Sequence, residues 1–293
     1  MILFIGKGGR AGNQLFQLAF LESIRRPRER VLCTGLGESL GLLRGMRGYF
    51  NFDGWTAINL ADHVARPLLL RMCRVPSLIG SFLEGDGNVS RRGSRRQLRF
   101  VDGYFQSEDW IRTLPAAFSL QDGLLALARQ IVPPPGTNTP LFVHVRRGDY
   151  LTYARQERDD PSLPGSYYVE AVSRLKSCVR SPHFYFVGDD PDWCESQFDW
   201  LEEKTVSRNA KGIDLAIMSL CAGGVVSNSS FAWWGAHLCS RSAPVIAPRY
   251  WFRWRRKEWY PRRIRSAMFD YIDPNEFSGK GGQASLGDGG YGT

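Results

Sequence analysis

The chain has 293 residues and a net charge of +9, from 38 Lys and Arg against 29 Asp and Glu. Its residues are 43% hydrophobic and 13% aromatic, enough to bury a core, which excludes a disordered chain. No apolar run approaches the roughly 20 residues that span a bilayer, so we expect no transmembrane anchor. The positive charge favours an anionic partner, such as phosphate groups, nucleic acid or an anionic membrane surface.

The N-terminal segment reads as a short strand, a glycine-rich loop and a helix, over residues 1–24. Without a basic region followed by a long apolar run, it predicts no signal peptide and a cytoplasmic protein. Residues 6–11 match G-x-G-x-x-A, a dinucleotide-binding motif. Such a site also needs an acidic residue at a strand end about 20 residues further on, and the segment at that spacing does not resemble a strand end. A nicotinamide site is therefore a weak alternative. The stronger hypothesis is an anion site at a helix N-terminus. Its glycines and amide side chains are Gly8, Gly9, Gly12, Asn13 and Gln14.

Residues 25–110 are less regular, with basic clusters at 25–30 and 91–96 that we interpret as solvated surface. Residues 104–110 are a candidate strand end leading into a helix, and a helix is predicted over 116–131. The proline-rich stretch 131–140 then predicts a domain boundary. We therefore expect two domains and a Gly/Ser-rich flexible tail, over residues 1–135, 136–277 and 278–293.

Strands and helices alternate after the boundary, which predicts a parallel sheet covered on both faces. Ligands bind such sheets at the carboxyl ends of the strands, here after Val145, Gly188 and Val226. The predicted strands are 141–145, 183–188, 224–228 and 244–248, and the predicted helices are 166–179, 190–198, 212–222 and 230–240.

In the string HVRRGDY (144–150), charged side chains follow directly after the end of a predicted buried strand. Side chains alternate along a strand, so His144 and Arg146 should share one side and Arg147 should take the other. A guanidinium at this position can clamp a phosphate through two hydrogen bonds. Asp149 could orient an arginine or bind a hydroxyl, and we expect it to form a structural ion pair with Arg147.

Carboxylates follow the next strand. Asp190 and Asp192 match D-x-D, a short motif that binds divalent ions in many nucleotide-sugar enzymes. N-capping of a helix by Asp189 or Asp190 explains the same letters and is the preferred interpretation.

The string SNSSFAWWGAHL (227–238) places small polar side chains at a strand end before a helix, again an anion-binding arrangement. Adjacent tryptophans face different sides of a helix, so we expect one of Trp233 and Trp234 to reach the pocket and the other to lie in the core. His237 is expected to be structural. Further on, residues 250–263 mix aromatic and basic side chains, which favours nucleic acid, a membrane or the rim of an anionic substrate site.

Several strings together resemble glycosyltransferase family 11, the α-1,2-fucosyltransferases that use GDP-fucose. They are GRAGNQLFQLA, HVRRGDY, DDPDW, DLAIMSLC, SNSSFAWWGA and VIAPRYWF, in the family's order, and they cover about 1–22 and 141–252. The resemblance implies an α/β fold of the GT-B type, with two Rossmann-like domains facing across a cleft. It also implies inversion at the sugar carbon, no cofactor and no metal requirement.

The resemblance assigns roles to individual residues. Arg146 would grip the GDP phosphates, His144 and Asp214 would lie by the guanine and ribose, and Ser229 and Ser230 would bind phosphate oxygens. The predicted catalytic residues are Arg146 and Asp149, with Asp149 a candidate general base. The predicted donor-binding residues are Gly9, Gly12, Asn13, Gln14, His144, Arg146, Asp190, Asp214, Asn228, Ser229, Ser230 and Phe231.

The chain departs from the family at Gly223, Ala232 and His237, where histidine, serine and tryptophan are common; we interpret these as changes in substrate fit. The expected function is transfer of L-fucose from GDP-L-fucose to a galactose of a surface glycan or oligosaccharide. We expect the protein to act at the inner membrane face, in peripheral contact with an anionic membrane or a lipid-linked acceptor. Nucleic acid is not an expected partner. The alternatives are another GDP-sugar or linkage in the same fold, and a basic nucleic-acid-binding or membrane-binding protein without transferase activity.

Overall fold

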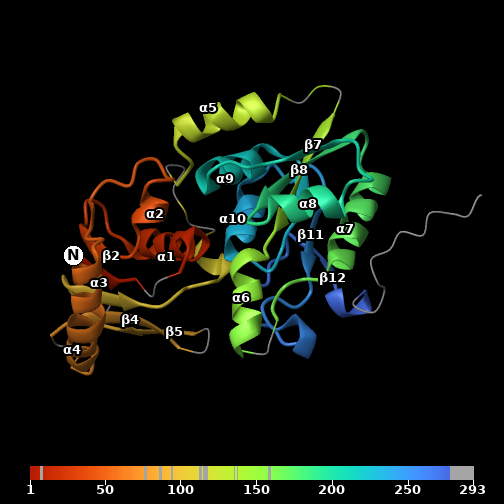
Figure 1. Cartoon of the computed structure of the whole chain (residues 1–293). Coiled ribbons are helices and arrows are strands. Elements are labelled where there is room, and N and C mark those ends of the chain that lie inside the picture. The colour runs from red at the N-terminus through yellow and green to blue at the C-terminus, as the bar shows by residue number, and fades with distance from the viewer. Residues whose placement is uncertain are drawn as a thin grey trace, which may run out of the picture.

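The computed structural model contains two six-stranded sheets, each with helices on both faces (Figure 1). It describes residues 1–6, 9–75, 78–85, 88–93, 95–111, 114, 118–134, 136, 138–157 and 160–277, without the side chains of 55–57 and 153–157. Gly8 of the glycine loop and the predicted tail 278–293 lie outside the described residues.

The first sheet has the order β3-β2-β1-β6-β4-β5, and its strands are parallel except for β5, which is antiparallel to β4. Strand β1 and helix α1 (Ala11–Ile24) confirm the strand and helix predicted within residues 1–24, whereas the other strands come from the less regular segment that follows. The strands of this sheet are β1 (Ile2–Ile5), β2 (Val31–Thr34), β3 (Tyr49–Asn51), β4 (Gly80–Gly85), β5 (Asn88–Arg92) and β6 (Arg99–Asp102).

Side chains alternate along β1, and both sets are buried, so both faces of the first sheet are covered. Ile2 and Phe4 pack in the core that contains helix α1 (Ala11–Ile24), whereas Leu3 and Ile5 pack beneath the opposite helical layer. That layer consists of α3 (Trp55–Leu60), the π-helical η1 (Ala61–Ala65) and α4 (Arg66–Met72). The short helices α2 (Gly37–Leu40) and η2 (Glu108–Trp110) complete this half.

The second sheet is parallel throughout, in the order β12-β11-β10-β7-β8-β9, which confirms the predicted parallel α/β arrangement. Its strands are β7 (Thr139–Val145), β8 (Pro182–Gly188), β9 (Lys204–Val206), β10 (Gly223–Val225), β11 (Val245–Pro248) and β12 (Asp270–Ile272). Its helices are α5 (Asp122–Ile131), α6 (Gly148–Glu157), α7 (Gly165–Cys178), α8 (Pro191–Gln197), α9 (Lys211–Leu220), α10 (Ser230–Leu238), η3 (Trp254–Arg256) and η4 (Pro274–Glu276).

The strands predicted from 141 onwards are confirmed, as are helices α7, α9 and α10 within a few residues at their ends. Helix α5 begins at Asp122 rather than at 116, and it packs against α9 of the second half, although it precedes the predicted boundary. Helix α6 was not predicted, because Gly148 favours a turn over a helix start.

The two halves share one hydrophobic core at the contact between α1 and α10. The ring of Phe16 lies 4.8 Å from that of Trp233 and 5.3 Å from that of Trp234, and all three side chains are fully buried. The expectation that one tryptophan reaches the pocket is therefore wrong, because α1 covers the side of α10 that would otherwise expose the second ring.

Gly12 permits this close contact. A Cβ added at Gly12 would lie 2.2 Å from the backbone nitrogen of Phe231 and 2.5 Å from the carbonyl carbon of Ser230. The first turns of α1 and α10 therefore meet backbone to backbone.

Among the residues that the structure describes, no helix has both the length and the apolarity needed to cross a bilayer.

We expect Gly12→Ala to lower the free energy of unfolding by about 1–3 kcal/mol, because the methyl group must push α1 away from α10. The matched control is Gly123→Ala in α5, where the described residues leave the added Cβ in open space. The control should be stabilised by about 1 kcal/mol, since alanine favours the helix. Urea denaturation of both variants checks this, and a Gly12→Ala protein as stable as the parent would contradict it.

Candidate active site

A cavity of about 750 Å3 lies between the two halves, at the carboxyl ends of strands from both sheets. The first half supplies the loop after β1 and the segment after β6, and the second half supplies the loops after β7, β8 and β10. The charged side chains that line it are Arg10, Arg146, Asp149, Asp189, Lys211, Asp214, Arg253 and Arg256. The three loops predicted to hold the site, after Val145, Gly188 and Val226, all contribute to it.

First-turn residues of four helices line this cavity, namely α1, α6, α9 and α10. Each of these helices follows a parallel strand, so its N-terminus lies at the carboxyl edge of a sheet. A helix N-terminus presents unpaired backbone N–H groups and a partial positive charge. Their convergence therefore makes the cavity suited to an anion.

Arg146 is held in place by two carboxylates. Its guanidinium lies 2.6 Å from a carboxylate oxygen of Asp149 and 2.9 Å from Oδ2 of Asp189, and it lies over the ring of Tyr150 at 5.4 Å. The side chain is only 15% exposed. The guanidinium is thus preorganised at the cavity wall, as the prediction for this residue requires.

Arg147 points away from the cavity. Its Nε donates to Asp190 at 3.1 Å, and its guanidinium lies over Trp193 at 4.4 Å. The expected pair of Arg147 with Asp149 is therefore wrong, and Arg146 takes that partner. The reason is helix α6: because it begins at Gly148, Asp149 falls in its first turn, three residues from Arg146 and on the same side.

His144 is buried beside Arg146, as the alternation of β7 predicted. Its Nδ1 lies 2.8 Å from Oγ of Ser227. Burial lowers the pKa of His144 to about 4, against the opposing influence of Asp189 and with a smaller lowering by Arg146. The imidazole is therefore neutral at pH 7 and adds a hydrogen-bonding group rather than charge.

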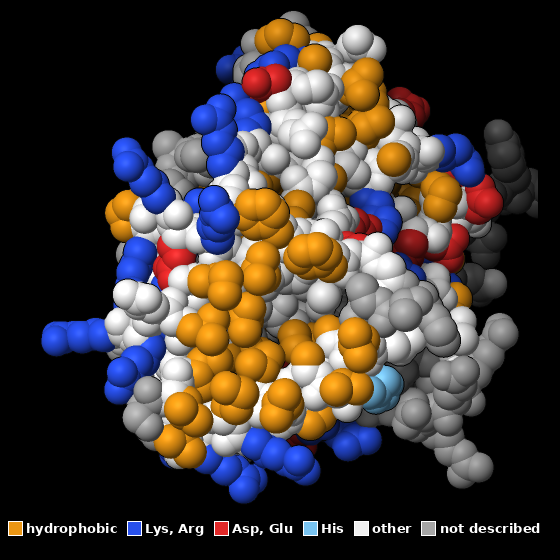
Figure 2. All heavy atoms as spheres, turned by 90° about the vertical axis from the view of Figure 1, so that its left-hand side faces the viewer, with side chains coloured by type: hydrophobic (Ala, Val, Ile, Leu, Met, Phe, Trp, Pro, Cys, Tyr) orange, Lys and Arg blue, Asp and Glu red, His pale blue; other side chains and the backbone are white. Residues whose placement is uncertain are grey.

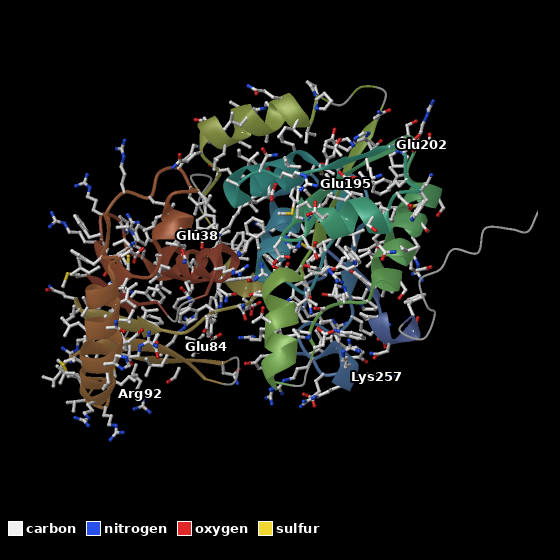
Figure 3. All side chains as sticks on the ribbon, viewed as in Figure 1. Glu38, Glu84, Arg92, Glu195, Glu202 and Lys257 are labelled. Carbon is white, nitrogen blue, oxygen red and sulfur yellow. The ribbon has the colours of Figure 1, made fainter. Side chains whose placement is uncertain are left out.

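Asp214 is a buried carboxyl group in the cavity wall. Burial raises its pKa to about 6, although the hydroxyl of Ser207 donates a hydrogen bond to it at 2.5 Å. The neighbouring Lys211 forms an ion pair with Glu38 of α2, a residue labelled in Figure 3. This wall of the cavity thus joins the second half of the molecule to the first.

The serine-rich turn before α10 meets the loop of the first half. Ser229 caps α10 by accepting from the backbone N–H of Phe231. Ser230 donates to Oδ1 of Asn13 at 2.7 Å, and the same oxygen accepts from Gln106 at 2.7 Å. Asn13 therefore connects the two halves across the cavity.

Asn228 and Gly9 complete this part of the wall. The side-chain amide nitrogen of Asn228 donates to the carbonyl oxygen of Pro161 at 2.7 Å, and the backbone carbonyl oxygen of Asn228 accepts from the hydroxyl of Tyr150. Gly9 has φ +95°, a conformation that favours glycine. Of the predicted donor-binding residues, those that line the cavity are Gly9, Gly12, Asn13, His144, Arg146, Asp214, Asn228, Ser229, Ser230 and Phe231, together with the catalytic candidate Asp149.

The structure places Gln14 and Asp190 outside the cavity wall. Gln14 is buried, where its side chain accepts from the backbone of Ser39 and donates to the carbonyl of Gly9. Asp190 caps α8, as the preferred interpretation predicted, and pairs with Arg147. The other carboxylate of the D-x-D string, Asp192, pairs with Arg208 at 2.7 Å.

The three departures from the family pattern lie away from the cavity. A Cβ at Gly223 would collide with the backbone carbonyls of Ala243 and Pro244 at the start of β10, so the expected change in substrate fit is wrong for this residue. Ala232 is fully buried in α10. His237 stacks on Trp233, and burial lowers its pKa to about 4, consistent with the structural role expected for it.

Several cavity residues were not singled out from the sequence. Arg10 reaches across from the first half, 3.5 Å from Asp149 and 3.8 Å from Asp189. It lies within the string GRAGNQ, so that string was its signal. Tyr150 and Asp189 lie within the strings HVRRGDY and DDPDW. Tyr104 and Gln106 follow β6, close to the strand end predicted at 104–110, but the sequence did not single them out as site residues.

Replacing Asp214 by asparagine should stabilise the protein above pH 6. A raised carboxyl pKa means that ionisation opposes folding, so the cost appears between about pH 4 and pH 6 and is full above that range. The difference between 3.8 and about 6 corresponds to about 3 kcal/mol.

We therefore expect Asp214→Asn to match the parent in denaturant stability at pH 4 and to exceed it at pH 7.5. Asp192→Asn, at an exposed carboxylate, is the control and should change stability by less than about 1 kcal/mol at either pH. Equal stability of Asp214→Asn and the parent at pH 7.5 would show that the carboxyl is not destabilised by burial.

Known proteins resemble this chain in sequence and in fold. The pattern of Glycosyl transferase family 11 matches residues 100–261. The chain is 30% identical over 277 residues to an α-1,2-colitosyltransferase of Escherichia coli, covering 83% of this chain and 90% of that protein. It is 31% identical over 115 residues to the O-antigen biosynthesis glycosyltransferase WbnK of Escherichia coli, and spans 38% of that protein's length.

Among solved structures, the α-1,6-fucosyltransferase NodZ, soaked with GDP-fucose, has a similar fold, with a TM-score of 0.50 and 13% identity over 81% of this chain and 92% of NodZ. This agrees with the predicted GT-B arrangement of two sheets facing across a cleft. The chain belongs to glycosyltransferase family 11.

Proposed function

We propose that this enzyme transfers L-fucose from GDP-L-fucose to a sugar hydroxyl, forming an α-1,2 link to a galactose of a glycan, with inversion and without a metal ion. The observation that carries the proposal is the fixed guanidinium of Arg146 at a cavity where the N-termini of four helices converge. A sugar diphosphate is an anion that such an arrangement binds. The cavity volume of about 750 Å3 also lies in the range of nucleotide-sized sites.

The same groups account for bond breaking. When the bond from fucose to phosphate breaks, negative charge develops on the GDP oxygens, and the fucose carbon passes through an oxocarbenium-like state. In this proposal the guanidinium of Arg146 and backbone N–H groups at the cavity wall stabilise that charge. Protein cations thus take the role that a divalent ion has in D-x-D enzymes, and both carboxylates of this chain's D-x-D string are paired with arginines.

Asp149 supports this chemistry through Arg146. Its carboxylate lies between Arg146 at 2.6 Å and Arg10 at 3.5 Å. Both guanidinium groups therefore compete with an acceptor hydroxyl for the oxygens of this carboxylate. We therefore assign Asp149 to positioning the two arginines rather than to deprotonating the acceptor.

Arg146→Ala should lower transfer from GDP-L-fucose by about 100- to 1000-fold, because it removes the principal cation at the developing charge. Arg147→Ala is the matched control, since its guanidinium lies outside the cavity. The control should keep most of its transferase activity at a temperature where it is folded. Initial rates of both variants with a galactoside acceptor test this, and near-normal transfer by Arg146→Ala would refute the mechanism.

A second donor is favoured by one observation, the 30% identity to an α-1,2-colitosyltransferase over most of both chains. Colitose is L-fucose without the 3-hydroxyl group, so a GDP-colitose site and a GDP-L-fucose site can share every phosphate and guanine contact. The difference must lie in the groups that face the sugar.

The donor is tested by measuring GDP release from GDP-L-fucose, GDP-colitose and GDP-mannose with a panel of galactosides, each with and without EDTA. We expect GDP-L-fucose to give the highest kcat/KM, and EDTA to leave the rate unchanged. A higher kcat/KM for GDP-colitose would show that GDP-colitose is the preferred donor. Strong inhibition by EDTA would contradict the metal-free mechanism.

A further inference from the structure

The helical layer formed by α3, η1 and α4 is apolar on both sides. Its inner side packs on the first sheet through Ala61, Ala65, Leu69 and Met72. A surface helix is normally polar on the side that faces water. The outward side of this layer does not follow that rule.

The outward side carries large apolar residues at helical spacing. Leu60, Val64 and Leu68 follow one another at intervals of four, and they are 61%, 57% and 56% exposed. The turn after α4 continues the surface. We call this surface the outer face, and its apolar residues are Leu60, Val64, Leu68, Leu70, Val75 and Leu78. Figure 2 shows hydrophobic side chains gathered on this side of the molecule, with Lys and Arg along much of their edge.

The outer face is also basic. Arg71 and Arg74 are exposed beside its apolar residues. Arg92 pairs with Ser81 across the β4–β5 hairpin and lies on the same sheet face as Leu83, which packs beneath α4. Figure 3 labels Arg92 at the end of the molecule that carries α4. The acidic residue within η1, Asp62, is neutralised by Arg66 at 2.9 Å.

Arg66 fixes this layer to the body of the protein. Besides Asp62, it binds Asp102 at 3.2 Å and donates to the carbonyl oxygens of Ile5 and Gly6. The outer face is therefore a fixed platform on the first half, with its apolar residues presented together. An apolar surface with a basic edge is the chemistry that binds the interface of an anionic bilayer.

We propose that the outer face docks on an anionic membrane surface, with Leu60, Val64 and Leu68 entering the headgroup region and Arg71, Arg74 and Arg92 contacting lipid phosphates. The sequence pointed instead to residues 250–263 for membrane contact. In the structure, arginines of that stretch stack on its own aromatic rings, as Arg253 does on Tyr260, and several of its residues line the cavity.

Two other occupants fit the observations less well. A second copy of the chain would bring two basic edges together, and like charges across a symmetric interface oppose association. The residues 278–293 contain one leucine and one tyrosine as large apolar side chains, too few to cover six exposed ones. Charge complementarity therefore favours the lipid surface.

The test is co-sedimentation of the full chain with vesicles of phosphatidylcholine containing 30 to 40% phosphatidylglycerol, and with vesicles of phosphatidylcholine alone. We expect binding to the anionic vesicles that weakens as salt is raised. The variant Leu60→Ser/Val64→Ser/Leu68→Ser should reduce the partition coefficient at least about tenfold. Arg71→Glu/Arg74→Glu should reduce it by a similar factor, since each cation near the surface contributes.

The control variant Leu127→Ser/Trp200→Ser changes two exposed apolar residues on the second half and should bind vesicles like the parent. All variants should release GDP from a water-soluble acceptor reaction at the parent's rate, which separates this proposal from the proposed function. Failure of the parent to bind anionic vesicles would overturn the proposal. So would undiminished binding by the triple-serine variant, or light scattering that shows a parent dimer converted to a monomer by those substitutions.

Discussion

The packing of α1 against α10 is the contact on which the site depends. Gly12 brings the first turns of the two helices into backbone contact, and Phe16 fills the space against Trp233 and Trp234. Because both helices begin at the carboxyl edge of a sheet, this contact also brings their N-termini to one cavity. A single packing arrangement thus joins the two halves and concentrates positive potential where the donor phosphates are proposed to bind.

The cavity carries an electrostatic cost that the fold offsets. Asp214 is a buried carboxyl whose pKa is raised to about 6, so its ionised form opposes folding at pH 7. His144, by contrast, is buried in the neutral form, with its pKa lowered to about 4. The guanidinium of Arg146 is paired directly with the carboxylates of Asp149 and Asp189. Residues at binding sites are commonly less than optimal for stability, and Asp214, which lines the cavity, is less than optimal for stability here.

The sequence predicted the second half well because its signals are local. Buried β-branched and aromatic runs end in loops, and Pro191 after Asp190 marks the start of α8. Beyond β1 and α1, the first half could not be predicted in this way, since its strands are short and several are only partly apolar; β5, for example, is exposed along most of its length. The site followed the same division. Arg146 and Ser230 were found from strand ends, whereas no motif around Gln106 marked it as a site residue.

The sequence also could not show which of several neighbouring charged residues pair with one another. Alternation along β7 correctly separated Arg146 from Arg147, but the partner of Asp149 depended on where α6 begins. Likewise, Gln14 reads as a donor for an anion, but in the structure its Nε2 donates to the carbonyl oxygen of Gly9.

The central claim is that Arg146 and the helix N-termini bind the diphosphate of the donor. A crystal structure of the enzyme with GDP tests it most directly. The account predicts phosphate oxygens within hydrogen-bond distance of Arg146 and of the backbone N–H groups at the start of α10. A diphosphate bound elsewhere, with Arg146 still paired only to Asp149 and Asp189, would contradict it.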